Sequence, residues 1–177
     1  MYKCVGYSNK STNIFSIDNI KEVWTQECRA YDSKNDGFNY HASLITNGYT
    51  PCKMVEIENI AKRFGENFPS ETSSNASTMH EGGTCLRLNC NYEYGRGGTV
   101  ADIGDGAMSL NLNVKSNYNY ANNGSGFLTY NNTRMWVIDC ESFQNLETQV
   151  SINSSNPAVT KYRNILSYNT VFNAVQI

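Results

Sequence analysis

The chain contains two histidines, His41 and His80, whose surroundings share a pattern. Residues 36–41 (DGFNYH) align position by position with residues 75–80 (NASTMH), so the two histidines occupy the same place in successive copies of a repeat. Histidine changes its charge near neutral pH and serves as a general acid, a general base or a metal ligand. The positions one and three before the histidine are mostly apolar across the copies and should point inward. Because side chains alternate along a strand, we expect both imidazoles to point outward, about 4.8 Å apart at the end of one sheet.

Carboxylates follow the histidines along the chain. Glu81 comes directly after His80, and Asp102 and Asp105 occupy the corresponding stretch of the next copy. Simple alternation would bury Asp102 and expose Ile103, which is unfavourable for both. A one-residue bulge in this strand would turn Asp102 outward beside His80, since bulges often re-aim side chains next to active sites. Asp105 lies between two glycines, so its turn can approach a ligand closely.

These side chains suit general acid–base chemistry, with His41, His80, Glu81, Asp102 and Asp105 as the candidate catalytic residues. On a glycan, the substrate that the family resemblance given below implies, such a cluster could act in two ways. In hydrolysis, one carboxylic acid protonates the glycosidic oxygen, and a carboxylate activates water or attacks directly. Carboxyl groups about 5 Å apart give retention and those about 6.5–9.5 Å apart give inversion, and Glu81 with Asp105 could meet either range. In elimination, histidine or arginine would remove the C5 proton of a uronic acid.

Four further residues are candidates for substrate binding: Arg96, Asp36, Tyr40 and Tyr130. Arg96 lies in the glycine-rich turn GRGG and would supply a cation to the same surface. Tyr130 stands at the histidine position two copies later, where a ring could stack on a sugar. Asp36 is about 16 Å from His41 along an extended strand, and its Asp-Gly pair also fits an ordinary turn.

Other interpretations of the same residues stay open. Two stacked histidines also form an ordinary solvated ladder, and residues 102–106 form an ordinary acceptor-rich turn. No cofactor is expected, although a divalent metal held by His41 and His80 with an Asp or Glu is the alternative. The absence of any C-x-x-C spacing argues against a structural zinc site.

The elements that carry these residues follow from the cysteines. Cys4, Cys28, Cys90 and Cys140 each precede an apolar residue by ten positions, and seven copies of this unit begin at positions 4, 28, 59, 90, 114, 140 and 165. A period near 25 residues with short alternating strands and polar turns predicts an all-β fold, a solenoid of about seven coils in one domain over residues 1–177. The cysteines should then form an inward ladder of free thiols.

Composition excludes several classes of protein. The 177 residues have a formal net charge of −2, which provides no basic surface for nucleic acid, and no apolar run reaches the roughly 20 residues of a membrane span. The first residues lack the pattern of a secretory signal. About one residue in seven is asparagine, which we expect to serve the coil turns because it tolerates left-handed backbone.

The period and the ladders resemble the right-handed parallel β-helix of the pectate-lyase-like superfamily, and the order of DGFNYH, STMHEGG and VADIGDG-x₂-SLNLNV resembles phage-associated and bacterial members that act on polysaccharides. The resemblance implies a polysaccharide hydrolase or lyase of tail-spike type that is extracellular or virion-associated. The alternative is a non-catalytic glycan-binding or structural spike. Residues 63–75 would form a loop protruding beside the site. Uncapped ends suggest a segment of a longer solenoid, a homotrimer or end-to-end association.

Overall fold

The structure, a computed structural model, describes residues 1–8, 12–45, 48–50, 52–66, 74–80, 82–96, 99–103, 107–119, 125–130, 133–142, 150–153, 159–163 and 175–176. Every regular element in these ranges is a β-strand, so the prediction of an all-β fold is confirmed for them. The described residues accordingly include no helix that is long and apolar enough to cross a membrane.

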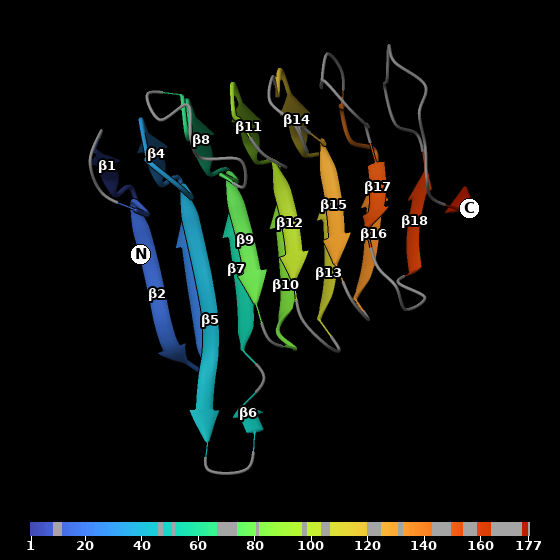
Figure 1. Ribbon diagram of the computed structural model, residues 1–177, viewed down its shortest axis with the longest axis horizontal. Helices are drawn as coiled ribbons and strands as arrows, with labels where there is room; N and C mark the ends of the chain where they lie inside the picture. Colours follow the sequence, from blue (N-terminus) through green and yellow to red (C-terminus); the bar gives the residue numbers. More distant parts are fainter. Residues whose placement is uncertain are drawn as a thin grey trace.

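The strands form three sheets, here called sheets 1, 2 and 3 (Figure 1). Sheet 1 contains, in order, β1 (Val5–Tyr7), β4 (Arg29–Tyr31), β8 (Ile60–Lys62), β11 (Asn91–Glu93) and β14 (Lys115–Asn117). Sheet 2 contains β3 (Glu22–Gln26), β7 (Lys53–Ile57), β10 (Thr84–Leu88), β13 (Met108–Leu112), β16 (Arg134–Ile138), β18 (Val159–Arg163) and β19 (Val175–Gln176). Sheet 3 contains β2 (Phe15–Ile20), β5 (Phe38–Ile45), β9 (Ser77–His80), β12 (Val100–Ile103), β15 (Phe127–Tyr130) and β17 (Val150–Asn153), with β6 (Gly48–Thr50) paired to β5.

The chain visits sheet 1, then sheet 3, then sheet 2, and repeats this order from β1 through β16. All pairs along the three sheets are parallel, and only the β5–β6 pair is antiparallel among the described strands. Each strand therefore pairs with its counterpart one coil away, as Figure 1 shows from the N-terminal side to the C-terminal side. This is a parallel β-helix-like architecture.

Left-handed backbone closes the corner before the six predicted anchors that the structure describes. The residue preceding the anchor has a φ between 51° and 54° in six successive copies: Lys3, Glu27, Glu58, Asn89, Asn113 and Asp139. Only two of the six are asparagine, so the expectation that asparagine serves these turns is only partly confirmed. Left-handed backbone costs a non-glycine residue roughly 1–2 kcal/mol. The corner tolerates other residues because its amide donates a hydrogen bond to the neighbouring coil, as Glu27 N does to Ile57 O at 2.9 Å, and this bond offsets the cost.

Five of the anchor residues line up inside the coils as expected, whereas Cys4 is only half-buried and position 165 lies outside the described residues. Cys28, Cys90 and Cys140 are buried together with Asn59 and Val114, and the residues that follow them pair in register from strand to strand. All six cysteines are free. Burial raises the pKa of the Cys90 and Cys140 thiols to about 12, so they stay protonated and act as small packing groups.

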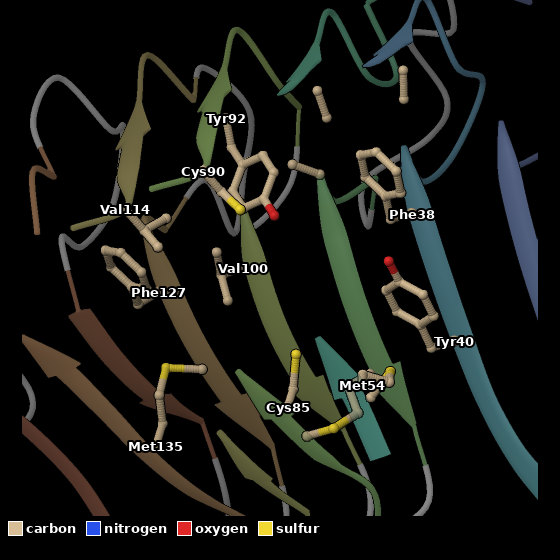
Figure 2. Close-up of a cluster of buried hydrophobic side chains, with 14 of the residues drawn as sticks. Phe38, Tyr40, Met54, Cys85, Cys90, Tyr92, Val100, Val114, Phe127 and Met135 are labelled. Atoms are coloured by element: carbon tan, nitrogen blue, oxygen red, sulfur yellow. The ribbon is translucent and has the colours of Figure 1, made fainter. Parts of the chain in front are cut away.

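Side chains of the three sheets meet in one core (Figure 2). Phe38 of β5, Val100 of β12 and Phe127 of β15 belong to sheet 3 and are fully buried, as their apolar positions predicted, and β9 lies between the first two strands. Met54 and Met135 approach them from sheet 2. The strand ends of sheet 3 that carry the histidines are therefore fixed by a packed interior.

Candidate functional site

The two histidines meet on the outer face of sheet 3. Phe38 and Tyr40 of β5 pair with Ser77 and Met79 of β9, which places His41 beside His80. Their imidazole rings stack with centroids 4.1 Å apart and an interplanar angle of 7°. Adjacency on neighbouring coils was predicted from the sequence, and the structure has it.

His80 lies in a poorly solvated environment. Its Nε2 atom is buried and has no hydrogen-bond partner in the described part of the chain. Burial, and to a smaller extent the neighbouring His41, lower the pKa of His80 to about 4, while Asp18 opposes both. The imidazole of His80 is therefore neutral at physiological pH and offers a free nitrogen lone pair rather than a positive charge.

The stacked geometry does not suit a metal chelate. A metal bound by an imidazole lies close to the plane of that ring, and two nearly parallel planes about 4 Å apart do not share such a point. Within the described residues no group of three or more His, Cys, Asp or Glu side chains could hold a metal ion. One of the two rings would have to rotate before a divalent metal could bind both.

A β-bulge adjoins the histidines, although not where the sequence placed it. Ile17 pairs with Tyr40 and Ile20 with Ala42, so Asp18 and Asn19 of β2 together face His41. Asn19 has a left-handed φ of 57° and Asp18 is exposed. The bulge thus brings an exposed carboxylate to the histidine row, where sequence reasoning expected Asp102.

The outward orientation predicted for Asp102 is wrong. The β12 strand pairs with β9 without a bulge, so Ile103 faces His80 and Asp102 points into the coil with 0% exposure. Its carboxylate accepts hydrogen bonds from Arg87 Nη1 at 3.1 Å and from the Ser109 hydroxyl. Burial raises the pKa of Asp102, and the charge of Arg87 opposes this rise. Arg87, the partner that compensates the burial of this charge, lies on sheet 2. The alternation of residues along β12 alone does not reveal a partner on another sheet.

Arg87 is the centre of a charged network that sequence analysis missed. It is fully buried on sheet 2, beside Glu56 of the preceding coil and Asn111 of the next. Arg87 Nε lies 3.4 Å from Glu56 Oε1 and donates to Ser77 Oγ at 2.8 Å. The signal was present in the sequence, because Glu56, Arg87 and Asn111 each stand three residues before an anchor, a position that faces the interior.

Asp36 is a structural group and not a surface ligand. It is 2% exposed at the entry to β5. Its carboxylate accepts hydrogen bonds from Asn75 N at 2.9 Å and from Asn39 Nδ2 at 2.5 Å. Burial raises the pKa of Asp36 to about 6, although these hydrogen bonds oppose the rise. The prediction of substrate binding by Asp36 is therefore wrong, and its role as a turn residue is supported.

Tyr40 and Arg96 also lie away from the histidine row. The Tyr40 side chain is 1% exposed and points inward (Figure 2), with its hydroxyl 3.2 Å from the Thr25 hydroxyl. Arg96 lies before the start of β12 and its amide bonds to Phe64 O. His80 pairs with Ile103 at the end of β12, which is three residues, or roughly 10 Å, beyond the start of that strand at Val100. Arg96 precedes Val100 and therefore stands at the opposite end of the sheet 3 strands from the histidines. Tyr40 therefore faces the interior instead of a ligand at the histidines, while binding by Arg96 stays a prediction.

Three further candidates remain predictions. Glu81 and Asp105 lie outside the described residues. The backbone of Tyr130 follows Thr129, which pairs with Asp102, so Tyr130 stands at the expected level of the histidine row, but its side chain is outside the described part. Most of the predicted loop, residues 67–73, also lies outside it.

A hairpin projects where sequence analysis placed no element. The β5 strand continues past His41 to Ile45 and pairs antiparallel with β6, and Figure 1 shows this arm extending beyond the sheets. The pair Asn47-Gly48 is a common hairpin signal and lies near this connection in the sequence, although Gly48 itself belongs to β6 and pairs with Ile45. The histidine row therefore lies at the base of a projecting arm.

This arrangement can bind and deprotonate better than it can protonate. It combines a neutral imidazole, a second imidazole stacked on it and the exposed carboxylate of Asp18. Of the carboxylates predicted to catalyse or bind, the two that the structure describes, Asp36 and Asp102, are buried. Comparison of the chain with protein-family models, with curated proteins and with solved structures gives no match.

Proposed function

We propose that the protein acts on a cell-surface or capsular polysaccharide and that the row containing His41 and His80 contacts the glycan. The stacked pair carries this proposal, because the two histidines of the chain meet on one outer flank of a parallel β-helix-like fold. An extended flank of repeated coils suits an extended polymer, since equivalent positions recur along it. The β5–β6 arm beside the pair would border the bound chain.

Elimination is the chemistry that these residues favour. A base removes the C5 proton of a uronic acid, the C4–O bond breaks, a C4–C5 double bond forms and the leaving oxygen takes up a proton. The base must be unprotonated, and the neutral His80 meets this condition at physiological pH, although its lowered pKa makes it a weaker base than an ordinary imidazole. Hydrolysis would need two accessible carboxyl groups, of which the exposed Asp18 is one, and the second would have to come from Glu81 or Asp105.

The finer assignment is part of the same proposal. We assign the chain to the right-handed, pectate-lyase-like β-helices, with about seven coils, and expect a tail-spike-like protein that is extracellular or virion-associated. Three parallel sheets visited in a fixed order and the period near 25 residues support this assignment.

A non-catalytic glycan-binding or structural spike is the second candidate. Its supporting observation is the burial of His80 Nε2, which limits access of a substrate proton to that atom. In that case the histidine row binds sugar without cleaving it.

The test is a panel of uronic-acid and neutral capsular polymers, assayed for reducing ends and for the ultraviolet absorbance of unsaturated products. His80→Gln and His41→Gln should abolish product formation while circular dichroism stays unchanged. Gln26→Ala, on another sheet, is the matched control and should keep wild-type activity.

The outcomes separate the two candidates. Unsaturated products that disappear in both histidine variants support elimination. Glycan binding without products, weakened by the same variants, supports the spike. Product formation or binding that is unaffected by both variants contradicts the placement of the site.

A further inference from the structure

The outer face of sheet 2 carries a continuous row of apolar side chains. Pairing across five adjacent strands, β3, β7, β10, β13 and β16, aligns the outward residues Trp24, Val55, Leu86, Leu110 and Trp136, here called the tryptophan row. Trp24 is 56% exposed and Leu110 is 37% exposed. A second, half-buried row on the same face consists of Ile57, Leu88, Leu112 and Ile138.

A groove of about 500 Å³ runs along this face, lined by Val55, Leu86, Leu110 and Trp136. The strands behind it have the reverse of the usual arrangement, because Glu56 and Arg87 point inward while their apolar neighbours point outward. A contiguous exposed apolar surface of this kind marks an interaction site.

We infer that the outer face of sheet 2 binds the same face of a second copy of this chain, related by a two-fold axis parallel to the strands at Leu86. This inference is independent of the proposed function, because the histidine row lies on sheet 3.

The order of residues in the tryptophan row supports a two-fold partner. Read from β3 to β16 the row is Trp, Val, Leu, Leu, Trp, which is nearly the same in both directions. The axis at Leu86 places Trp24 opposite Trp136 of the second copy and Val55 opposite Leu110 of the second copy. Large rings then meet at both ends, and Leu86 meets Leu86 at the centre.

Charges beside the row select this axis. The outward residues at the first position of the same strands run from Glu22 on β3 to Arg134 on β16, and both are exposed. An axis parallel to the strands keeps each residue at its level along the strand, so Glu22 faces Arg134 of the second copy. An axis perpendicular to the strands would instead set these charges against the row that contains Ile138. Face-to-face sheets also prefer strand directions within about 30° of each other.

The size of the face fits a weak dimer. Five strands about 4.8 Å apart, with five residues at about 3.3 Å each, cover roughly 400 Å² in projection. Side-chain relief enlarges this area, so two copies together reach the lower end of specific interfaces, near 1,000–1,200 Å² in total. We therefore expect association that depends on concentration in the micromolar range.

Sedimentation velocity over a concentration series tests the interface. The wild-type chain should shift from monomer to dimer, and Leu86→Lys should weaken dimerisation by more than about tenfold, because two ammonium groups would meet at an apolar centre. The matched control is Val5→Lys, a 54% exposed position on the outer face of sheet 1, which should leave dimerisation unchanged. Circular dichroism verifies that both variants fold.

A charge reversal tests the axis. Glu22→Arg alone should weaken the dimer roughly three- to tenfold, since the unfavourable pair occurs twice. Adding Arg134→Glu should restore wild-type association. A wild-type chain that stays monomeric or forms a trimer overturns the inference, as does a dimer that Leu86→Lys leaves intact or a double reversal that restores nothing. Monomers whose tryptophan row binds detergent micelles or a glycan would also overturn it, in favour of that occupant.

Discussion

Replacing Arg87 by methionine should destabilise the protein strongly and in a pH-dependent way. The substitution keeps much of the volume but removes the cation that lies between two fully buried carboxylates. Glu56 keeps hydrogen bonds from the Tyr92 hydroxyl at 2.8 Å and from Asn59 Nδ2 at 3.1 Å. Asp102 keeps the Ser109 hydroxyl but loses its charged partner, so we expect it to take up a proton.

The expected loss of unfolding free energy is the cost of keeping Asp102 protonated in the folded variant. Keeping an aspartate with an unfolded pKa of about 3.9 protonated at pH 7 costs about 3.1 times 1.36, or about 4 kcal/mol. This agrees with the roughly 3–5 kcal/mol typical of a broken buried ion pair. At pH 5 the same cost is only about 1.5 kcal/mol. The native pKa of Asp102 in the variant lies above the unfolded value, so stability is greatest at low pH and is lost as pH rises.

Urea unfolding followed by circular dichroism at pH 5 and pH 7 measures these differences. Arg29→Met, an exposed arginine on sheet 1, is the control and should change the free energy of unfolding by less than about 0.5 kcal/mol. Adding Asp102→Asn to Arg87→Met should recover most of the loss at pH 7 and remove its pH dependence. A loss below about 1 kcal/mol for Arg87→Met, or one that is equal at both pH values, would refute the reasoning.

Two further predictions concern stability. The pKa of His80 is lowered to about 4 from 6.5, so its contribution is complete above pH 6.5 and falls by about 3 kcal/mol as pH drops to 4. Urea unfolding of wild type and His80→Gln, above pH 6.5 and at pH 4, isolates this effect. Asp36, whose pKa is raised to about 6, has the opposite pH trend, but it contributes equally to both proteins. A difference in unfolding free energy between the two proteins that is the same at both pH values would contradict the prediction. Glu58→Gly should raise the unfolding free energy by about 0.5 kcal/mol, because glycine adopts the left-handed φ of 54° without strain. Glu22→Gly, in an extended strand, is the control and should lower the unfolding free energy by a similar amount. Thermal melts in which both variants have a lower midpoint than wild type would exclude this explanation.

Residues that follow the anchors in simple order were placed correctly from the sequence. Phe38 and Val100 are buried ten positions after their cysteines, and His41 stacks on His80, because stacked coils keep equivalent residues in register. Asp102 was placed wrongly because the rule that a charge avoids the interior takes no account of a partner from another sheet.

The period of the sequence by itself determined the coils, the cysteine ladder and the meeting of the two histidines, since each depends only on which residues recur at equal spacing. The tertiary structure decided which buried charges meet one another and which apolar side chains stay exposed on the outer face. Left-handed corners reset the alternation between sheets, and only the closed coil brings Arg87 to Asp102 while it leaves Trp24 and Leu110 exposed. Such contacts cross the interior between strands that the repeat relates only indirectly, so spacing along the chain can place Arg87 in the interior but does not show that Asp102 is its partner there.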